Sequence, residues 1–262
     1  MNAPLVMPAP AAPAAAGRTL SPSQVNTSLD CQARWYYGSI AKLPDPPNGG
    51  LTLGRAIHYA AAVYLRLRSQ GEHPIHADLA ELFAHTFKQE LPQTEIRPDE
   101  DPALLLADGL AMLAMFTGQV APQIDAAAVE LQVHGKIGSQ HVRGIVDVIT
   151  TEGVVIDLKT SSKKPGAISA SYALQLTTYG LLTSKRETRL ITLARTKTPS
   201  WCQHTLSLTP AHTQYAATIY DMAAESMQSG LYLPNRGSYL CSRRHCAFWR
   251  ECQAEYGGVV PE

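Results

Sequence analysis

The chain has 262 residues, of which 45% are hydrophobic and 17% are charged, and its formal net charge is zero. A chain of this length and composition can bury one large core or two small ones. It contains no uninterrupted run of eighteen apolar residues, so we expect it not to span a membrane. The balanced charge gives no global indication of a polyanionic partner.

Residues 1–18 form a leader in which alanine and proline predominate, and the leader has no basic start. This composition favours a disordered segment over a secretory signal, so we expect a cytoplasmic protein. The rest of the chain, 19–262, is expected to form a single domain. We divide it into a helical region (19–126), a sheet core (127–232) and a cysteine-rich tail (233–262).

The first half of the chain has helical patterning. Ser21, followed by Pro22 and by Gln24 three residues on, predicts a capped helix start. Apolar residues at helical spacing predict helices over about 51–69, 76–90 and 102–118, and the proline- and glycine-rich segment 44–50 predicts a loop.

In the second half, the hydrophobic period changes. Alternation and β-branched residues predict strands, and longer amphipathic segments predict helices. The expected order is strands 128–136, 141–149 and 153–159, helix 167–184, strands 188–195 and 201–208, and helix 210–229. This order predicts an α/β fold with a mixed central sheet flanked by helices. The tail after Leu233 has few apolar residues, and we expect no core element there.

Two short apolar runs are each followed by a carboxylate. Residues 145–146 precede Asp147, and residues 154–156 precede Asp157, with Lys159 two residues further on. Because side chains alternate along a strand, Asp157 and Lys159 should share a face, and a neighbouring strand could add Asp147. Buried charges need partners or a metal, and two carboxylates beside an ammonium can hold a divalent cation for phosphodiester hydrolysis. An Asp-x-Lys pair standing alone more often marks a solvated strand edge.

Charge is distributed unevenly along the chain. Residues 71–130 hold eleven acidic side chains against two basic ones, whereas residues 142–200 hold nine basic side chains against four acidic ones. A basic surface around the paired carboxylates is compatible with phosphate binding, although a mixed solvated surface explains any single charge equally well.

Two pairs of residues stand four apart within predicted helices, Gly54 with His58 and Gln175 with Tyr179. Gly54 would let its helix approach the sheet, so that His58 would face the carboxylates. A lone helical histidine is more often an ordinary core residue than a ligand. As a ligand, imidazole would favour Mn²⁺ over Mg²⁺.

These motifs, in this order, resemble those of the RecB-like branch of the PD-(D/E)XK nucleases, which includes AddB-type and CRISPR-associated iron–sulfur nucleases and phage exonucleases. The similarity covers Leu20 to about Tyr256. The resemblance implies a restriction-endonuclease-like core with an N-terminal helical region and a C-terminal cysteine-rich tail.

The resemblance also implies roles for individual residues. His58, Asp147, Asp157 and the Leu158 carbonyl would bind Mg²⁺ or Mn²⁺. Lys159 would position or activate the attacking water and stabilise the developing charge. Gln175 and Tyr179 match a helix motif usually assigned to DNA contact and site support, and Glu130 would be an outer ligand or a supporting group.

Five is an odd number of cysteines, and the chain has no export signal, so the sequence does not favour a disulfide framework. Metal binding by the cysteines is the better hypothesis. Three of them cluster in the tail and one lies far upstream, and in the iron–sulfur members of this branch such an arrangement binds a 4Fe–4S cluster. The implied ligands are Cys31, Cys241, Cys246 and Cys252. A structural zinc site and unrelated thiols are the alternatives. Cys202 is expected to be an ordinary packing residue.

The function implied by this resemblance is a metal-dependent deoxyribonuclease, an exonuclease acting on DNA ends or single strands. Recombination, repair, phage replication and CRISPR adaptation are the expected settings, with recombination or repair proteins or further copies of the chain as partners. Two alternatives stay open: a non-catalytic nucleic-acid-binding subunit, and an iron–sulfur structural or redox protein whose carboxylates only pair with basic neighbours.

Overall fold

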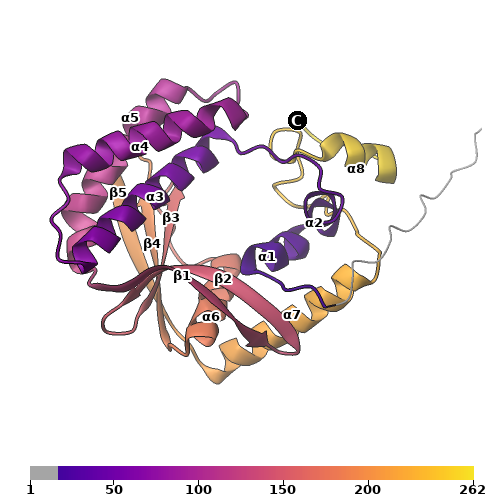
Figure 1. The fold of residues 1–262 in the computed structure, drawn as a ribbon. Coiled ribbons are helices and arrows are strands. Elements are labelled where there is room, and N and C mark those ends of the chain that lie inside the picture. Colours follow the sequence, from indigo (N-terminus) through magenta and orange to yellow (C-terminus); the bar gives the residue numbers. More distant parts are fainter. Residues whose placement is uncertain (1–16) are drawn as a thin grey trace, which may run out of the picture. The chain divides into compact units, whose positions relative to one another are not determined.

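The computed structural model describes residues 17–262 (Figure 1), so the predicted leader lies outside the described residues except for its last two positions. The chain divides into two compact units. The terminal unit comprises the segment up to Asp45, residues 136–142 and everything from Ala217 onward. The sheet unit comprises residues 46–135 and 143–216. The boundaries of a single nuclease domain therefore stay a prediction.

The predicted helices and strands occur in the predicted order, and the structure adds two helices that were not predicted, Gln32–Ser39 and Trp249–Tyr256. The helices are α1 (Pro22–Asp30), α2 (Gln32–Ser39), α3 (Gly49–Ser69), α4 (His76–Glu90), α5 (Pro102–Met115), α6 (Ala170–Thr183), α7 (Pro210–Gln228) and α8 (Trp249–Tyr256). Three short helical segments are η1 (Leu91–Gln93), η2 (Phe116–Val120) and η3 (Ala121–Gln123). The strands are β1 (Ala126–Ile137), β2 (Gln140–Thr150), β3 (Val155–Ser161), β4 (Glu187–Ala194) and β5 (Ser200–Ser207).

The five strands form one mixed sheet in the order β1-β2-β3-β4-β5. Strand β3 pairs antiparallel with β2 and parallel with β4, and β4 pairs antiparallel with β5. Helix α6 makes the crossover that a parallel pair requires. The predicted mixed α/β sheet flanked by helices is therefore confirmed, and β3 lies at its centre.

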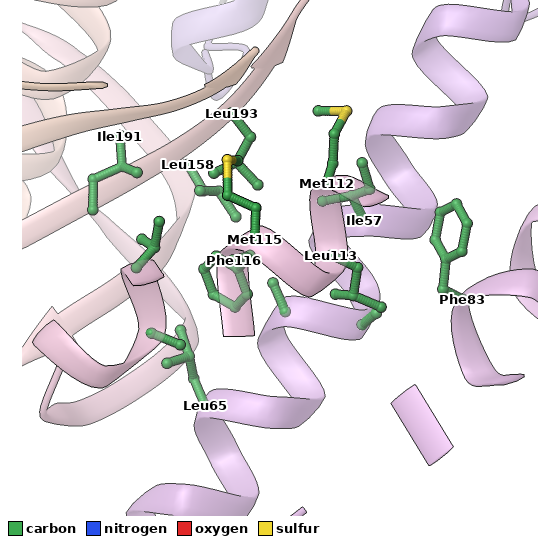
Figure 2. Close-up of a cluster of buried hydrophobic side chains, with 14 of the residues drawn as sticks. Ile57, Leu65, Phe83, Met112, Leu113, Met115, Phe116, Leu158, Ile191 and Leu193 are labelled. Atoms are coloured by element: carbon green, nitrogen blue, oxygen red, sulfur yellow. The ribbon is translucent and has the colours of Figure 1, made fainter. Parts of the chain in front are cut away.

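One face of the sheet is covered by α3, α4 and α5, which form a shared core (Figure 2). Ile57, Leu113 and Phe116 from the helical side meet Leu158 and Leu193 from the strands. The three helices pack closely where α5 has a glycine. A Cβ at Gly109 would come within 2.1 Å of the Phe83 ring.

The segment from α5 to η3, Pro102–Gln123, is long and apolar enough to cross a membrane when judged by length and composition alone, with a mean hydropathy of 1.6. In the fold, one side of this segment lies in the core of the sheet unit, where Leu105, Met112 and Phe116 are almost completely buried, whereas Leu104 is 63% exposed. A helix that lies in the core of a folded protein can have the same length and apolar composition as one that crosses a membrane.

Helix α6 packs against β3 and β4 in the sheet unit. It begins at Ser169, whose hydroxyl accepts a hydrogen bond from the Tyr172 N–H. Tyr179 from this helix joins Val146, Ile149 and Val155 in a second apolar cluster. The predicted helix was three residues longer at its start, because residues 167–169 form the capping turn instead.

In the terminal unit, α1 begins with the predicted capping box between Ser21 and Gln24. The expectation that the tail holds no core element was wrong. Phe248 and Cys252 are 2% and 7% exposed and pack with Ala33 and Tyr37 around α8. Of the buried side chains in this small core, the tail itself contributes Phe248 and Cys252. The other two, Ala33 and Tyr37, come from α2, more than 200 residues earlier in the sequence.

Candidate active site

Asp147 lies where the pairing of β2 with β3 ends. The last paired residues of this ladder are Val148 and Ile156. Beyond them, the Asp147 carboxylate takes the place of a backbone acceptor, and its Oδ2 accepts the Leu158 N–H at 2.7 Å. The strand end thereby fixes the position of this carboxylate.

Asp157 and Lys159 project from β3 and are in contact. Lys159 Nζ lies 2.7 Å from Asp157 Oδ2, and the Asp157 side chain is only 2% exposed. The other oxygen, Oδ1, is buried and has no hydrogen-bond partner among the described residues. A buried carboxylate oxygen without a partner is costly, so this atom is poised to accept a proton or to bind a cation.

His58 comes from α3 and reaches the same strand ends. Its Nδ1 lies 3.7 Å from Asp147 Oδ2. The helix can come this close because a Cβ at Gly54, one turn earlier, would meet Thr160 Oγ1 of β3 at 2.7 Å. The expected close approach of helix and sheet is therefore observed.

Burial dominates the electrostatics of these four side chains. Burial, opposed by Lys159 and reinforced by Asp147, raises the pKa of Asp157 to about 6, and burial also raises the pKa of Asp147. Burial and the charge of Lys159 lower the pKa of His58 to about 4. Burial alone would lower the pKa of Lys159, but Asp157 and Asp147 outweigh it, so this pKa lies above its usual value. At neutral pH, the imidazole is therefore neutral and the amine is charged.

The site opens into a cleft of about 800 Å³ within the sheet unit. His58, Asp147 and Lys159 line it, together with side chains that the sequence analysis did not single out. These are Arg55, Tyr59 and Arg66 of α3 and Tyr172 of α6. The Lys159 ammonium lies 5.7 Å from the centre of the Tyr172 ring. Arg55 and Arg66 could have been predicted from helical spacing, because they lie about one turn before and about two turns after His58 on α3.

Glu130 of β1 also lines this cleft. Its backbone has φ of 54°, which is unusual for a residue with a side chain and rarer still within a strand. Burial and the nearby charge of Asp147 raise the pKa of its carboxyl group. No pattern in the neighbouring residues predicts this backbone conformation.

Gln175 and Tyr179 contact each other rather than the cleft. Gln175 Nε2 donates to Tyr179 Oη at 3.0 Å, and neither residue is among those that line the cleft. Tyr179 instead packs against Gly144 of β2, where a Cβ would lie 2.6 Å from Cε1 of the ring. This places the pair behind the strand that carries Asp147.

The nitrogen and oxygen atoms of His58, Asp147 and Asp157 are of the kinds that bind divalent cations, but they do not surround a common point. Among residues 17–262, no group of three or more His, Cys, Asp or Glu side chains is arranged so that it could hold a metal ion. The 3.7 Å between His58 Nδ1 and Asp147 Oδ2 is nevertheless within the roughly 4.2 Å that two ligands at about 2.1 Å can span. The unpartnered Oδ1 of Asp157 supplies a further oxygen.

Comparison with known protein families decides the classification. The model of the PD-(D/E)XK nuclease superfamily matches residues 19–253. The chain belongs to this superfamily. Members typically use a divalent metal ion to cleave phosphodiester bonds, so nucleic acid is the expected substrate class. The fold class expected from the resemblance is confirmed as well.

Solved structures resemble this PD-(D/E)XK chain at low sequence identity. A candidate exonuclease from Eubacterium rectale matches with a TM-score of 0.58 and 12% identity, over 93% of this chain and 90% of the other. The structure of SSO0001 matches with a TM-score of 0.46 and 15% identity, over 92% and 89% of the two chains. At 12% identity, the first of these matches shows a common fold alone. No curated protein matches the sequence.

The terminal unit of the PD-(D/E)XK chain brings its four predicted cysteine ligands to one small cavity. Cys31, Cys241, Cys246 and Cys252 all line it, and all are free thiols. Hydrogen bonds reach two of the sulfurs, from the Asn235 N–H to Cys31 at 3.5 Å and from Arg236 to Cys241 at 3.9 Å. As noted above, no group of three or more of the described side chains is arranged so that it could hold a metal ion, and this includes the thiols.

Cys202 lies apart from these four, on β5 of the sheet unit. Its Sγ contacts the carbonyl oxygen of Pro165 at 3.9 Å. The expectation that it is a packing residue agrees with this position.

Proposed function

We propose that the chain is a metal-dependent deoxyribonuclease whose active site is the cleft at the ends of β2 and β3. The observation that carries this proposal is the contact of buried Asp157 with Lys159 at 2.7 Å, beside Asp147 and His58. A solvated strand edge would leave Asp157 exposed, whereas its side chain is 2% exposed. Burying the Asp157 carboxylate costs free energy, and binding a cation would offset that cost.

His58, Asp147 and Asp157 would hold Mg²⁺ or Mn²⁺, with the Leu158 carbonyl as a further ligand. When bound, the ion would supply Lewis-acid stabilisation of the phosphate and a more acidic water. Neutral His58 offers a nitrogen lone pair, which favours Mn²⁺ relative to a site made of oxygens alone. The hydrogen bond from the Leu158 N–H keeps Asp147 oriented toward the cleft.

Lys159 would orient the attacking water and stabilise the negative charge that develops on the phosphate. Its raised pKa keeps Lys159 protonated at neutral pH, which suits charge stabilisation rather than proton abstraction. In the hydrolysis, the water oxygen bonds to phosphorus, the phosphorus–oxygen bond to the leaving nucleoside breaks, and a proton passes to that leaving oxygen. Arg55 and Arg66 line the cleft and would bind flanking phosphates.

We further propose exonucleolytic action on DNA ends or single strands. The fold neighbour from Eubacterium rectale is named as a candidate exonuclease, which supports this choice. The test is incubation of uniformly labelled linear DNA and of the same DNA in covalently closed form with Mn²⁺ or Mg²⁺. We expect release of acid-soluble label from the linear form only, and no cleavage when the metal is chelated. Cleavage of the closed form at an equal rate would contradict the exonuclease assignment.

The catalytic assignment is tested by Lys159→Met, with Lys163→Met as the matched control. Lys163 is an exposed lysine that follows the same strand. We expect a loss of at least about 100-fold in cleavage for Lys159→Met and no change for Lys163→Met. Equal activity of Lys159→Met and the wild type would overturn the assignment, and equal inactivity of all three would favour a non-catalytic binding subunit.

We propose, finally, that the four cysteines of the terminal unit bind a 4Fe–4S cluster, as in the iron–sulfur branch of the superfamily. Support comes from their convergence on one cavity and from the hydrogen bonds that reach the sulfurs of Cys31 and Cys241. The cavity holds about 20 Å³, roughly the space of one water, so a cluster requires the thiols to move apart. Zinc is the alternative occupant.

A further inference from the structure

Residues 235–250 of the cysteine-rich tail carry a local positive charge, which the three glutamates of residues 251–262 and the zero net charge of the chain conceal. Residues 235–250 contain four arginines and no acidic residue. Of these arginines, Arg243, Arg244 and Arg250 are exposed. A run of one sign in a chain of balanced composition creates a local field that attracts anions.

Two of these guanidinium groups lie over one aromatic ring. The Cζ atoms of Arg250 and Arg243 are 4.6 and 4.9 Å from the centre of the Trp249 ring, which is itself partly exposed. Both distances are within the range of a cation–π contact. Trp249 starts α8, and the neighbouring Phe248 is almost completely buried, so the indole is attached to a fixed part of the terminal unit.

A second aromatic residue lies close by in the sequence. Tyr239 is 78% exposed, and its ring centre is 5.2 Å from that of His245. A tyrosine this exposed gains little from folding, because most of its apolar area stays in water. An aromatic ring in a cationic environment is instead suited to a ligand that has both flat rings and negative charges.

We propose that Trp249, Arg243 and Arg250 form a binding site for single-stranded nucleic acid on the terminal unit. The guanidinium groups would bind phosphates, and a base would stack on Trp249, with Tyr239 available to a neighbouring base. This inference rests on the proposed function only in that the substrate is DNA. It adds a contact outside the cleft of the sheet unit, made by residues with no part in the hydrolysis.

The ion pair between Arg243 and Glu262 is no obstacle to this binding. The Glu262 side chain is 88% exposed, and Arg243 is 37% exposed. Exposed pairs of this kind contribute little to stability, so a phosphate can displace the carboxylate at small cost. An acidic protein segment could pair with the arginines as well as a nucleic acid does, but its carboxylates would not stack on the aromatic rings as bases do.

The test is fluorescence anisotropy of a labelled oligothymidylate, with full-length protein carrying Lys159→Met so that the probe is not digested. Affinity is measured between 50 and 200 mM salt. For Arg243→Gln with Arg250→Gln, we expect at least tenfold weaker binding at low salt and a salt slope smaller by about 1.4, from about 0.7 per lost phosphate contact. Lys42→Gln, an exposed cation of the terminal unit, is the charge control and should bind normally.

Base stacking is tested separately at Trp249. Trp249→Leu should weaken binding by about 5- to 150-fold with an unchanged salt slope, and Trp249→Phe should restore most of the affinity. Tyr215→Ala, which removes an aromatic residue that is 52% exposed on α7, is the matched control. Far-UV circular dichroism and melting temperature check that each variant is folded.

Three outcomes would overturn the inference. They are wild-type affinity in the double arginine variant, wild-type affinity in Trp249→Leu, and equally tight binding of polyglutamate or of anionic lipid vesicles. Failure of the cleavage test would leave these binding results interpretable, because they use a variant without Lys159. Conversely, an active nuclease whose tail variants bind normally would refute this inference alone.

Discussion

Gly144 of β2 lies directly against the ring of Tyr179 of α6: a Cβ at this glycine would be 2.6 Å from Cε1 and 3.3 Å from Cδ1 of the ring. Real Cβ atoms do not come this close to another atom, so either the strand or the ring would have to move. Asp147 lies three residues along the same strand, and Gln175 donates a hydrogen bond to Tyr179. The glycine therefore sets how closely the helix supports the strand that carries a proposed ligand.

Gly144→Ala is expected to lower the free energy of unfolding by about 1–3 kcal/mol, because overpacking forces the ring or the strand to shift. Cleavage should fall too, since Asp147 would move with β2. Urea denaturation measures the first effect. The control is Gly166→Ala, where the added methyl group meets no atom within 4 Å. If Gly144→Ala and Gly166→Ala were equally stable, the proposed close packing would be refuted.

The sequence was sufficient to predict the contacts that follow from local periodicity. Alternation along a strand places Asp157 and Lys159 on one face, and they are 2.7 Å apart. The helical interval between Gly54 and His58 predicts a helix that approaches the sheet and a histidine directed at it, and the structure has both features. These predictions succeed because each depends on residues fewer than five positions apart.

Features that depend on distant partners were not predicted. Helix α8 is preceded by the buried Phe248, which packs against Tyr37 of α2, more than 200 residues earlier in the sequence. Tyr172 belongs to no motif, and its place beside Lys159 follows from how α6 crosses over β3. The positive φ of Glu130 likewise depends on its surroundings, since nothing in its neighbouring residues requires it.

The metal-free protein should show two opposing pH effects on stability between pH 4 and 6.5. The pKa of Asp157 is raised by burial to about 6, so ionising it destabilises the fold as pH rises from about 4 to 6. The pKa of His58 is lowered to about 4, so its protonation destabilises the fold as pH falls from 6.5 to 4. Each effect amounts to about 3 kcal/mol, and together they nearly cancel.

Single variants should expose each effect. In chelator-treated protein, His58→Asn should lose more stability than the wild type as pH rises from 4 to 6, because the His58 effect no longer opposes that of the buried carboxyl groups. Asp157→Asn should lose more stability than the wild type as pH falls from 6.5 to 4, because the Asp157 effect no longer opposes that of His58. Urea denaturation at pH 4.5, 5.5 and 7 measures both slopes. Wild-type slopes in both variants would show that these side chains are not buried as described.

Mn²⁺ should stabilise the wild-type protein against heat, because it would bind the folded state only. At 100 times the dissociation constant, the expected gain is about 2.7 kcal/mol. Asp157→Asn should abolish most of this gain, since Oδ1 would no longer carry negative charge. Glu152→Gln, which changes an exposed carboxylate in the turn before β3, should retain it. A melting temperature of Asp157→Asn that responds to Mn²⁺ as the wild type does would argue against the proposed ligand.

The four cysteines of the terminal unit give a prediction that is independent of the cleft. Cys246→Ala should remove the visible absorbance and the iron of anaerobically purified protein and lower its melting temperature, because the cluster would join the tail to α1 and α2. Cys202→Ala is the matched control, since this thiol lies on β5 away from the cavity, and it should keep both colour and iron.

Elemental analysis then distinguishes the two possible occupants of the cysteine cavity. Iron with acid-labile sulfide supports the cluster, whereas one zinc per chain without colour would replace it by a structural zinc site. If Cys246→Ala retained the metal and the melting temperature of the wild type, neither occupant would be bound there. The burial of Phe248 and Tyr37 beside Cys252 would then be enough to hold the tail, and the cavity would be an ordinary packing defect between three short helices.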